Sequence, residues 1–164
     1  MMTCADPRGR WLAALALLFL GAGSAGAESA ARTDAALRLD EARRIAGALV
    51  DLATEKGRSV SVVVVNREGR IILSQRMDDA SFVSLQLAEG KAITAAAVGV
   101  PTRLLEQQVD GGKASVLSAP GVIAIAGGVP VARNGKVVAA IGVSGAASDE
   151  DDMMATAARD AVIR

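Results

Sequence analysis

The hydrophobic positions of the chain follow helical spacing in several segments. Over residues 40–56, apolar side chains recur every three or four positions and charged side chains occupy the opposite side. This pattern predicts an amphipathic helix. Similar spacing predicts helices over about 81–98, 103–109 and 149–163. The helix over 81–98 is rich in alanine, which allows either tight packing on a sheet or the close approach of a flat ligand.

A first β-hairpin is predicted after the first helix. Residues 60–65 comprise five valines and one serine, a segment too short and too β-branched for a helix. The turn sequence Asn66-Arg67-Glu68-Gly69 follows, and Gly69 can adopt the positive φ that tight turns require. Residues 70–76 then return as the second strand, so the two strands pair antiparallel.

A second hairpin is predicted near the C-terminus. The pair Asn134-Gly135 is typical of two-residue hairpin turns. The strand that follows, 136–143, is apolar on both faces, so we expect it in the centre of the sheet. Pro130 cannot donate a ladder hydrogen bond, so we expect it in an edge strand or at the start of a strand. Residues 122–126 are expected to form one further strand.

The order of these elements indicates the fold class. One helix is followed by two strands, two helices, two or three strands and a last helix. Strands that are grouped rather than alternating one by one with helices predict an α+β sandwich, with one antiparallel sheet of about five strands and helices packed on it.

The N-terminal residues 1–27 have the pattern of a secretory signal peptide. Arg8 and Arg10 precede a short apolar run, and small residues with an Ala-x-Ala site at 25–27 follow it. We expect cleavage before Glu28, a mobile leader over 28–37 and one domain over 38–164. The mature protein is therefore expected in the periplasm or outside the cell, without a membrane partner after cleavage.

Composition excludes several classes of site. The chain has no histidine, and its single cysteine, Cys4, leaves with the signal segment, so triads built on His or Cys and the usual zinc sites are excluded. Loss of residues 1–27 leaves a formal net charge of −1, which argues against a nucleic-acid partner. These absences favour binding over catalysis, although buried lysines and carboxylates can transfer protons.

A few charged residues are candidates for chemistry. Lys91 falls in the alanine-rich helix, where a lysine either extends its ammonium to solvent or faces an anion. Arg76, Lys91 and Arg103 are predicted to receive a carboxylate of a ligand together. The acidic run 149–152 could bind a hard cation, but consecutive helix positions do not face one point, which favours a solvated first turn.

A set of short motifs resembles the GlcG/HbpS family, also called DUF336, which includes the C-terminal domain of PduO-type proteins. The resemblance covers about residues 38–163 and rests on the order and spacing of these motifs: Arg76-Met77-Asp78, Ser84, Lys91-Ala92-x-Thr94-Ala95, Pro101-Thr102, Pro120-Gly121, Gly127-Gly128-Val129-Pro130 and Gly142-Val143-Ser144-Gly145. It implies a profilin-like α/β/α fold and a homo-oligomer.

The resemblance also implies a function. Some secreted members bind haem, so we expect an exported protein that binds haem or another flat, anionic ligand. The family's ligand surface is expected near Arg76, Met77, Lys91, Thr94, Thr102 and Arg103. Without histidine, the haem iron would need Thr94, Thr102 or Met77 as a weak donor. Two alternatives stay open: an accessory protein or enzyme of small hydroxy-acid metabolism of the glycolate type, and a structural homo-oligomer without ligand.

Overall fold

The computed structural model describes residues 36–163, so the predicted signal segment 1–27 and most of the predicted leader lie outside the described residues. Leu37, the last residue of that leader, is buried and belongs to the hydrophobic core. No helix within 36–163 is long and apolar enough to cross a membrane. The elements are α2 (Leu39–Glu55), β1 (Ser61–Asn66), β2 (Ile71–Arg76), α3 (Ser84–Val98), α4 (Thr102–Asp110), the 3₁₀ helix η1 (Ala114–Ser118), β3 (Gly128–Arg133), β4 (Lys136–Ser144) and α5 (Ser148–Val162).

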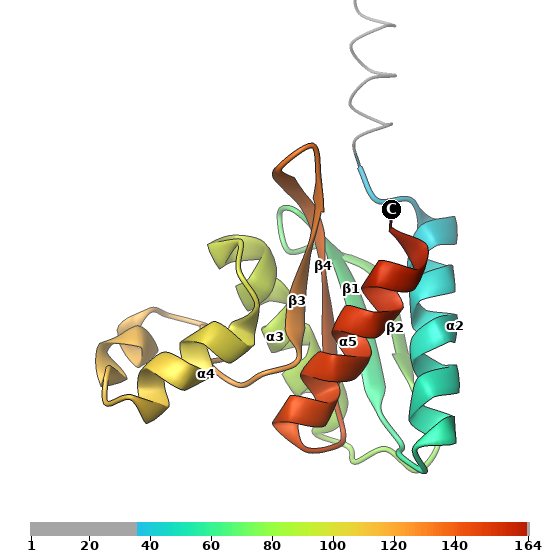
Figure 1. The fold of residues 1–164 in the computed structure, drawn as a ribbon, viewed down its shortest axis with the longest axis horizontal. Helices are drawn as coiled ribbons and strands as arrows, with labels where there is room; N and C mark the ends of the chain where they lie inside the picture. Colours follow the sequence, from blue (N-terminus) through green and yellow to red (C-terminus); the bar gives the residue numbers. More distant parts are fainter. Residues whose placement is uncertain (1–35, 164) are drawn as a thin grey trace, which may run out of the picture. The chain divides into compact units, whose positions relative to one another are not determined.

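The strands form one antiparallel sheet in the order β2-β1-β4-β3 (Figure 1). Both predicted hairpins are confirmed, and β4 is central because it pairs with β1 on one side and with β3 on the other. Asn134 and Gly135 both have positive φ, 50° and 74°, as a type I′ turn requires. Pro130 lies in β3, which is an edge strand, as predicted.

The expected fifth strand is not present among the described residues, because 122–126 form no strand. Two threonine hydroxyls hold the backbone of this segment. Thr94 Oγ1 accepts from Ile123 N at 3.0 Å, and Thr102 Oγ1 donates to Ile125 O at 2.7 Å. The segment therefore runs along α3 and α4 instead of pairing with β3. The strand predicted there is wrong, because side-chain hydrogen bonds satisfy part of its backbone in another way.

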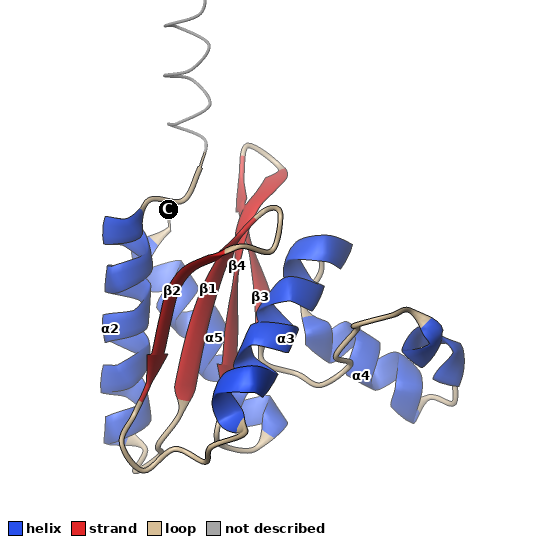
Figure 2. Cartoon of the chain, turned by 180° about the vertical axis from the view of Figure 1, so that it is seen from behind, coloured by secondary structure: helices blue, strands red, loops and turns tan. Residues whose placement is uncertain are grey.

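The sheet lies between two helical layers. Helices α2 and α5 cover one face, and α3 covers the other (Figures 1 and 2). Strand β1 is buried on both sides: Val62 and Val64 belong to the core cluster under α2 and α5, while Val63 and Val65 belong to the cluster under α3. This alternation explains why a run of valines can serve as a strand without a polar face. The α+β sandwich predicted from the sequence is confirmed.

The alanine-rich helix α3 packs very closely on β4. Ala88, Ala92 and Ala95 are completely buried against the sheet. At Gly142 in β4 the contact reaches the helix backbone itself, because a Cβ there would overlap Ala88 O and lie 2.8 Å from Ala92 N. The small residues of this helix thus serve tight helix-on-sheet packing. Close packing at this point also sets the position of Lys91.

Candidate functional site

The buried pair of Lys91 and Asp151 connects the two helical layers, near the start of β3 and the end of β4. Lys91 on α3 donates from Nζ to Asp151 Oδ2 on α5 at 2.9 Å and to Val143 O at 2.9 Å. Both side chains are 2% exposed. Lys91 therefore faces an anion, which was one of the two possibilities open from the sequence, and this anion belongs to its own chain.

The surroundings of Asp151 fix its carboxylate. Asp151 Oδ1 accepts from Ala146 N at 3.1 Å, within the loop that leads into α5. Gly127 covers the pair, since a Cβ at Gly127 would lie 2.7 Å from Val143 O and 3.0 Å from Lys91 Nζ. Burial raises the pKa of the Asp151 carboxyl, and the Lys91 ammonium opposes that rise. The pair is thus a buried ionic contact with its hydrogen-bonding groups largely satisfied.

A second carboxylate, Asp152, lies next to this pair and is 8% exposed. Its Oδ2 lies 3.4 Å from Nε of Arg103 on α4. Its Oδ1 is buried and has no hydrogen-bond partner within residues 36–163. Burial raises the pKa of the Asp152 carboxyl, while the Arg103 guanidinium and the Gly127 N–H favour its ionised form. The half-exposed Arg103 guanidinium is therefore the part of this cluster that a small molecule can reach.

The two threonines predicted as iron donors are buried and engaged. Thr102 is completely buried, and its Oγ1 accepts from Gly128 N at 2.8 Å in addition to donating to Ile125 O. Thr94 is 2% exposed, and its Oγ1 accepts from Ile123 N. Both hydroxyls hold the segment that leads into β3. The observed contacts of both threonines therefore stabilise the backbone of this segment.

The remaining predicted residues, Arg76 and Met77, lie elsewhere. Arg76 is exposed at the end of β2, the edge strand on the other side of the sheet from β3. Met77 packs against the α2/α5 core, and its sulfur accepts from Val60 N at 3.4 Å. The structure brings Lys91 and Thr102 to Gly127 and Gly128 and places Arg103 at the neighbouring Asp152, while Thr94 contacts Ile123. It does not bring Arg76 to them.

Sequence reasoning missed the role of the acids on α5. The run 149–152 was expected to form a solvated helix turn, but Asp151 and Asp152 are buried and contact Lys91 and Arg103. The described residues contain no group of three metal-ligating side chains, so the cation alternative gains no support. The sequence does contain one signal of this buried cluster. The motif Gly127-Gly128 has no side chains at the place where Lys91 and Asp151 meet, and this leaves room for them.

The raised pKa of Asp152 predicts a pH dependence of stability. The folded chain retains this proton above the ordinary pKa of 3.8, so the group's contribution is present at low pH and is lost as pH rises through the folded-state pKa. We expect Asp152→Asn to reduce the loss of unfolding free energy as pH rises above about 4, measured by urea titrations. Asp110→Asn, at an exposed acid, is the control and should leave the slope unchanged. If the pH dependence of the unfolding free energy is the same in Asp152→Asn as in the parent, the raised pKa of Asp152 is contradicted.

Comparison with known proteins identifies the family. A family model described as "Haem degrading protein HbpS-like" matches residues 37–160, nearly the whole described domain. The chain belongs to the HbpS-like family. Its resemblance to the GlcG/HbpS group, inferred above from short motifs, is thereby confirmed.

Relatives of this HbpS-like chain include proteins with solved structures. A double mutant of HbpS from Streptomyces reticuli is 36% identical, with a TM-score of 0.73, over 79% of this chain and 88% of that one. The structure described as a PduOC:heme complex is 30% identical, with a TM-score of 0.71, over 78% and 96% of the two chains. Protein GlcG of Escherichia coli K12 is 32% identical over 62% of this chain and 79% of its own length.

Proposed function

We propose that this HbpS-like chain is an exported protein that binds haem or a related tetrapyrrole as a homo-oligomer. The observation that carries the proposal is the similarity to the chain in the PduOC:heme complex, which extends over 78% of this chain. The family description and the likeness to HbpS support it. The proposal of export rests on the signal-peptide pattern of residues 1–27. The intact mass of the exported protein tests it and should equal that of a chain beginning at Glu28.

The residues present do not fit axial ligation of haem iron within one chain. Histidine is absent, and the only cysteine lies in the signal segment. The hydroxyls of Thr94 and Thr102 are buried and engaged with the backbone, and Met77 packs in the core. An iron bond to Thr102 would disrupt the hydrogen bonds that hold Gly128 and Ile125. The proposal therefore rests on recognition of the ring and its carboxylates, with no iron ligand supplied by these residues.

Two exposed arginines can meet ligand carboxylates. Arg76 ends β2, and the Arg103 side chain is 49% exposed on α4. Strand β2 is one edge of the sheet, and α4 lies on the side of the other edge strand, β3 (Figure 1), so within one chain the two arginines are alternatives. Guanidinium groups suit carboxylates because their donors match both oxygens.

Exposed apolar side chains can cover a flat ring or a second subunit. Phe82, the only aromatic residue within 36–163, is 88% exposed just before α3. Other exposed apolar side chains lie on α3 and just beyond its end: Ile93, Val98 and Val100. A helix that is apolar on most of its surface is usually covered on both sides. This surface supports the proposed homo-oligomer.

A titration of the purified protein with hemin tests the proposal. We expect a saturable Soret change that is weakened about tenfold by one of the two variants Arg76→Gln and Arg103→Gln, the size of effect expected for one charge-assisted contact. Thr94→Val, which nearly preserves volume, should leave the Soret position unchanged because no iron bond to Thr94 is expected. Light scattering of the same sample should give the mass of at least two chains.

Lys136→Gln serves as the control for charge, because Lys136 is exposed at the far end of the second hairpin. Non-saturable binding, or equal weakening by the control, would refute specific tetrapyrrole recognition. A Soret shift caused by Thr94→Val would show that iron ligation had been wrongly discounted. A single-chain mass would refute the homo-oligomer.

One observation favours a second function, the recognition of a small hydroxy acid. Within residues 36–163 the buried Oδ1 of Asp152 has no hydrogen-bond partner, and the half-exposed Arg103 guanidinium lies beside the same carboxyl group. A small hydroxy acid could place its carboxylate on Arg103 and its hydroxyl near the Asp152 carboxyl. Glycolate that raises the melting temperature of the parent but not of Asp152→Asn would favour this function over tetrapyrrole binding.

A further inference from the structure

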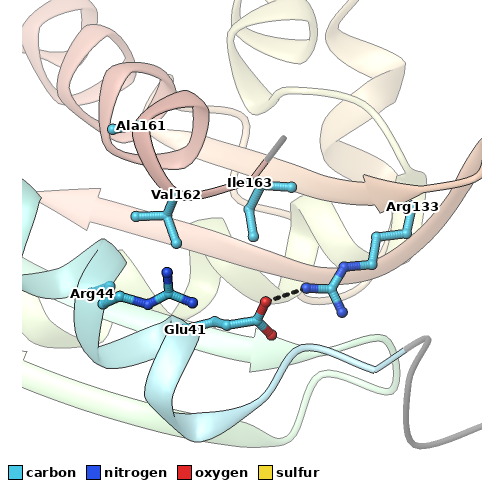
Figure 3. A pocket seen from close by; sticks show the side chains of 6 residues that line it. All are labelled: Glu41, Arg44, Arg133, Ala161, Val162 and Ile163. Carbon is cyan, nitrogen blue, oxygen red and sulfur yellow. Dashed lines mark hydrogen bonds and ion pairs between the residues drawn. The ribbon is translucent and has the colours of Figure 1, made fainter.

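A pocket of about 440 Å³ lies at the other end of the domain from the Lys91–Asp151 pair. It is formed where the beginning of α2, the end of α5 and the end of β3 meet, and is lined by Glu41, Arg44, Arg133, Ala161, Val162 and Ile163 (Figure 3). Its volume falls in the usual range for sites of small molecules. None of the residues discussed for tetrapyrrole or hydroxy-acid binding contributes to its lining.

Among the described residues, the polar lining of the pocket has no unused carboxylate oxygen. Glu41 Oε1 is paired with Arg133 Nη2, and Glu41 Oε2 accepts from Arg38 N at 2.9 Å. Arg133 also donates from Nη1 to Ala36 O at 2.9 Å. Both oxygens of the Glu41 carboxylate therefore already have partners within the protein.

Arg44 is the lining residue with donors to spare. Within residues 36–163 its nearest carboxylate contact is Asp40, at 3.8 Å, which is too long for a hydrogen bond. Asp40 is in turn held by Arg38, whose Nε and Nη2 lie 2.9 and 3.1 Å from the two carboxylate oxygens. A guanidinium carries five N–H donors, so Arg44 retains several for an occupant. An occupant of this pocket must bring the acceptors.

The other wall of the pocket is aliphatic. Val162 and Ile163 are half-buried, and Figure 3 shows their side chains directed from the end of α5 toward the Arg44 and Glu41 side. Such a wall favours an occupant with a short hydrocarbon part. We propose that this pocket binds a small aliphatic carboxylate, with its carboxylate on Arg44 and its chain against Val162 and Ile163.

The test follows the arginine side-chain Nε–Hε resonances of the purified protein by NMR during titration with sodium butyrate. We expect the Arg44 resonance to shift saturably, with butyrate binding about threefold more tightly than acetate, because two further methylenes contact part of the aliphatic wall. Arg44→Gln should weaken butyrate binding at least tenfold. Arg43→Gln is the matched control, since Arg43 is exposed on the same helix and does not line the pocket, and it should change the affinity less than twofold.

A third variant changes affinity in the opposite direction. Glu41→Gln removes the negative charge of the described pocket lining yet retains an acceptor for the Arg38 N–H, so it should strengthen butyrate binding. Circular dichroism confirms that each variant is folded before its titration is interpreted. The proposal is overturned if the Arg44 resonance does not saturate, if acetate or inorganic phosphate binds as tightly as butyrate, or if Arg43→Gln weakens binding as much as Arg44→Gln.

Discussion

Replacement of Lys91 by methionine is expected to lower the free energy of unfolding by about 3–5 kcal/mol, because it leaves one partner of a buried ion pair without the other. The methionine fills much of the space of the lysine, so the loss is mainly electrostatic. The Asp151 carboxylate would stay 2% exposed with no cation beside it, and Val143 O would lose its donor. Urea denaturation followed by circular dichroism measures the change.

Removing the second charge should restore part of this loss. In Lys91→Met with Asp151→Asn, no charge is left buried, and the asparagine can still accept from Ala146 N. The double variant should therefore be more stable than Lys91→Met alone. Lys136→Met, at an exposed lysine, is the control and should change stability by less than about 0.5 kcal/mol. A loss below about 1 kcal/mol in Lys91→Met would show that the pair contributes little.

The sequence predicts most of the fold because local signals determine most of it. The Asn134-Gly135 turn fixes the second hairpin, and the apolar character of 136–143 correctly indicates a central strand. The error at 122–126 arises from long-range contacts. Ile123 is held by Thr94, which lies 29 positions away along the chain, and no periodicity within the segment reports that bond.

The candidate site could be predicted only in part. The buried character of Lys91 follows from its alanine-rich neighbours, and the structure confirms that it faces an anion. Its partner could not be predicted, because Asp151 is 60 positions distant and occurs in a run of four acids that resembles a solvated turn. Position within a helix shows which residues share a face, but which faces are covered depends on the packing of the whole domain.

Replacement of Gly142 by alanine is expected to destabilise the fold by about 3 kcal/mol, at the upper end of the range for overpacked cores. The added Cβ would overlap Ala88 O and lie 2.8 Å from Ala92 N, and both atoms belong to the backbone of α3. No rotamer change can relieve such a contact. The helix would have to move away from β4, and this movement would also pull Lys91 from Asp151.

The matched control is Gly47→Ala in α2. Gly47 is exposed, and a Cβ there meets nothing within 4 Å, so alanine should raise the unfolding free energy by about 0.5–1 kcal/mol through helix propensity alone. Thermal melts of the two variants should thus shift in opposite directions from the parent. If Gly142→Ala melts at the parent temperature, α3 does not lie as close to β4 as the structure places it. The buried Lys91–Asp151 contact, which depends on that spacing, would then need a different explanation.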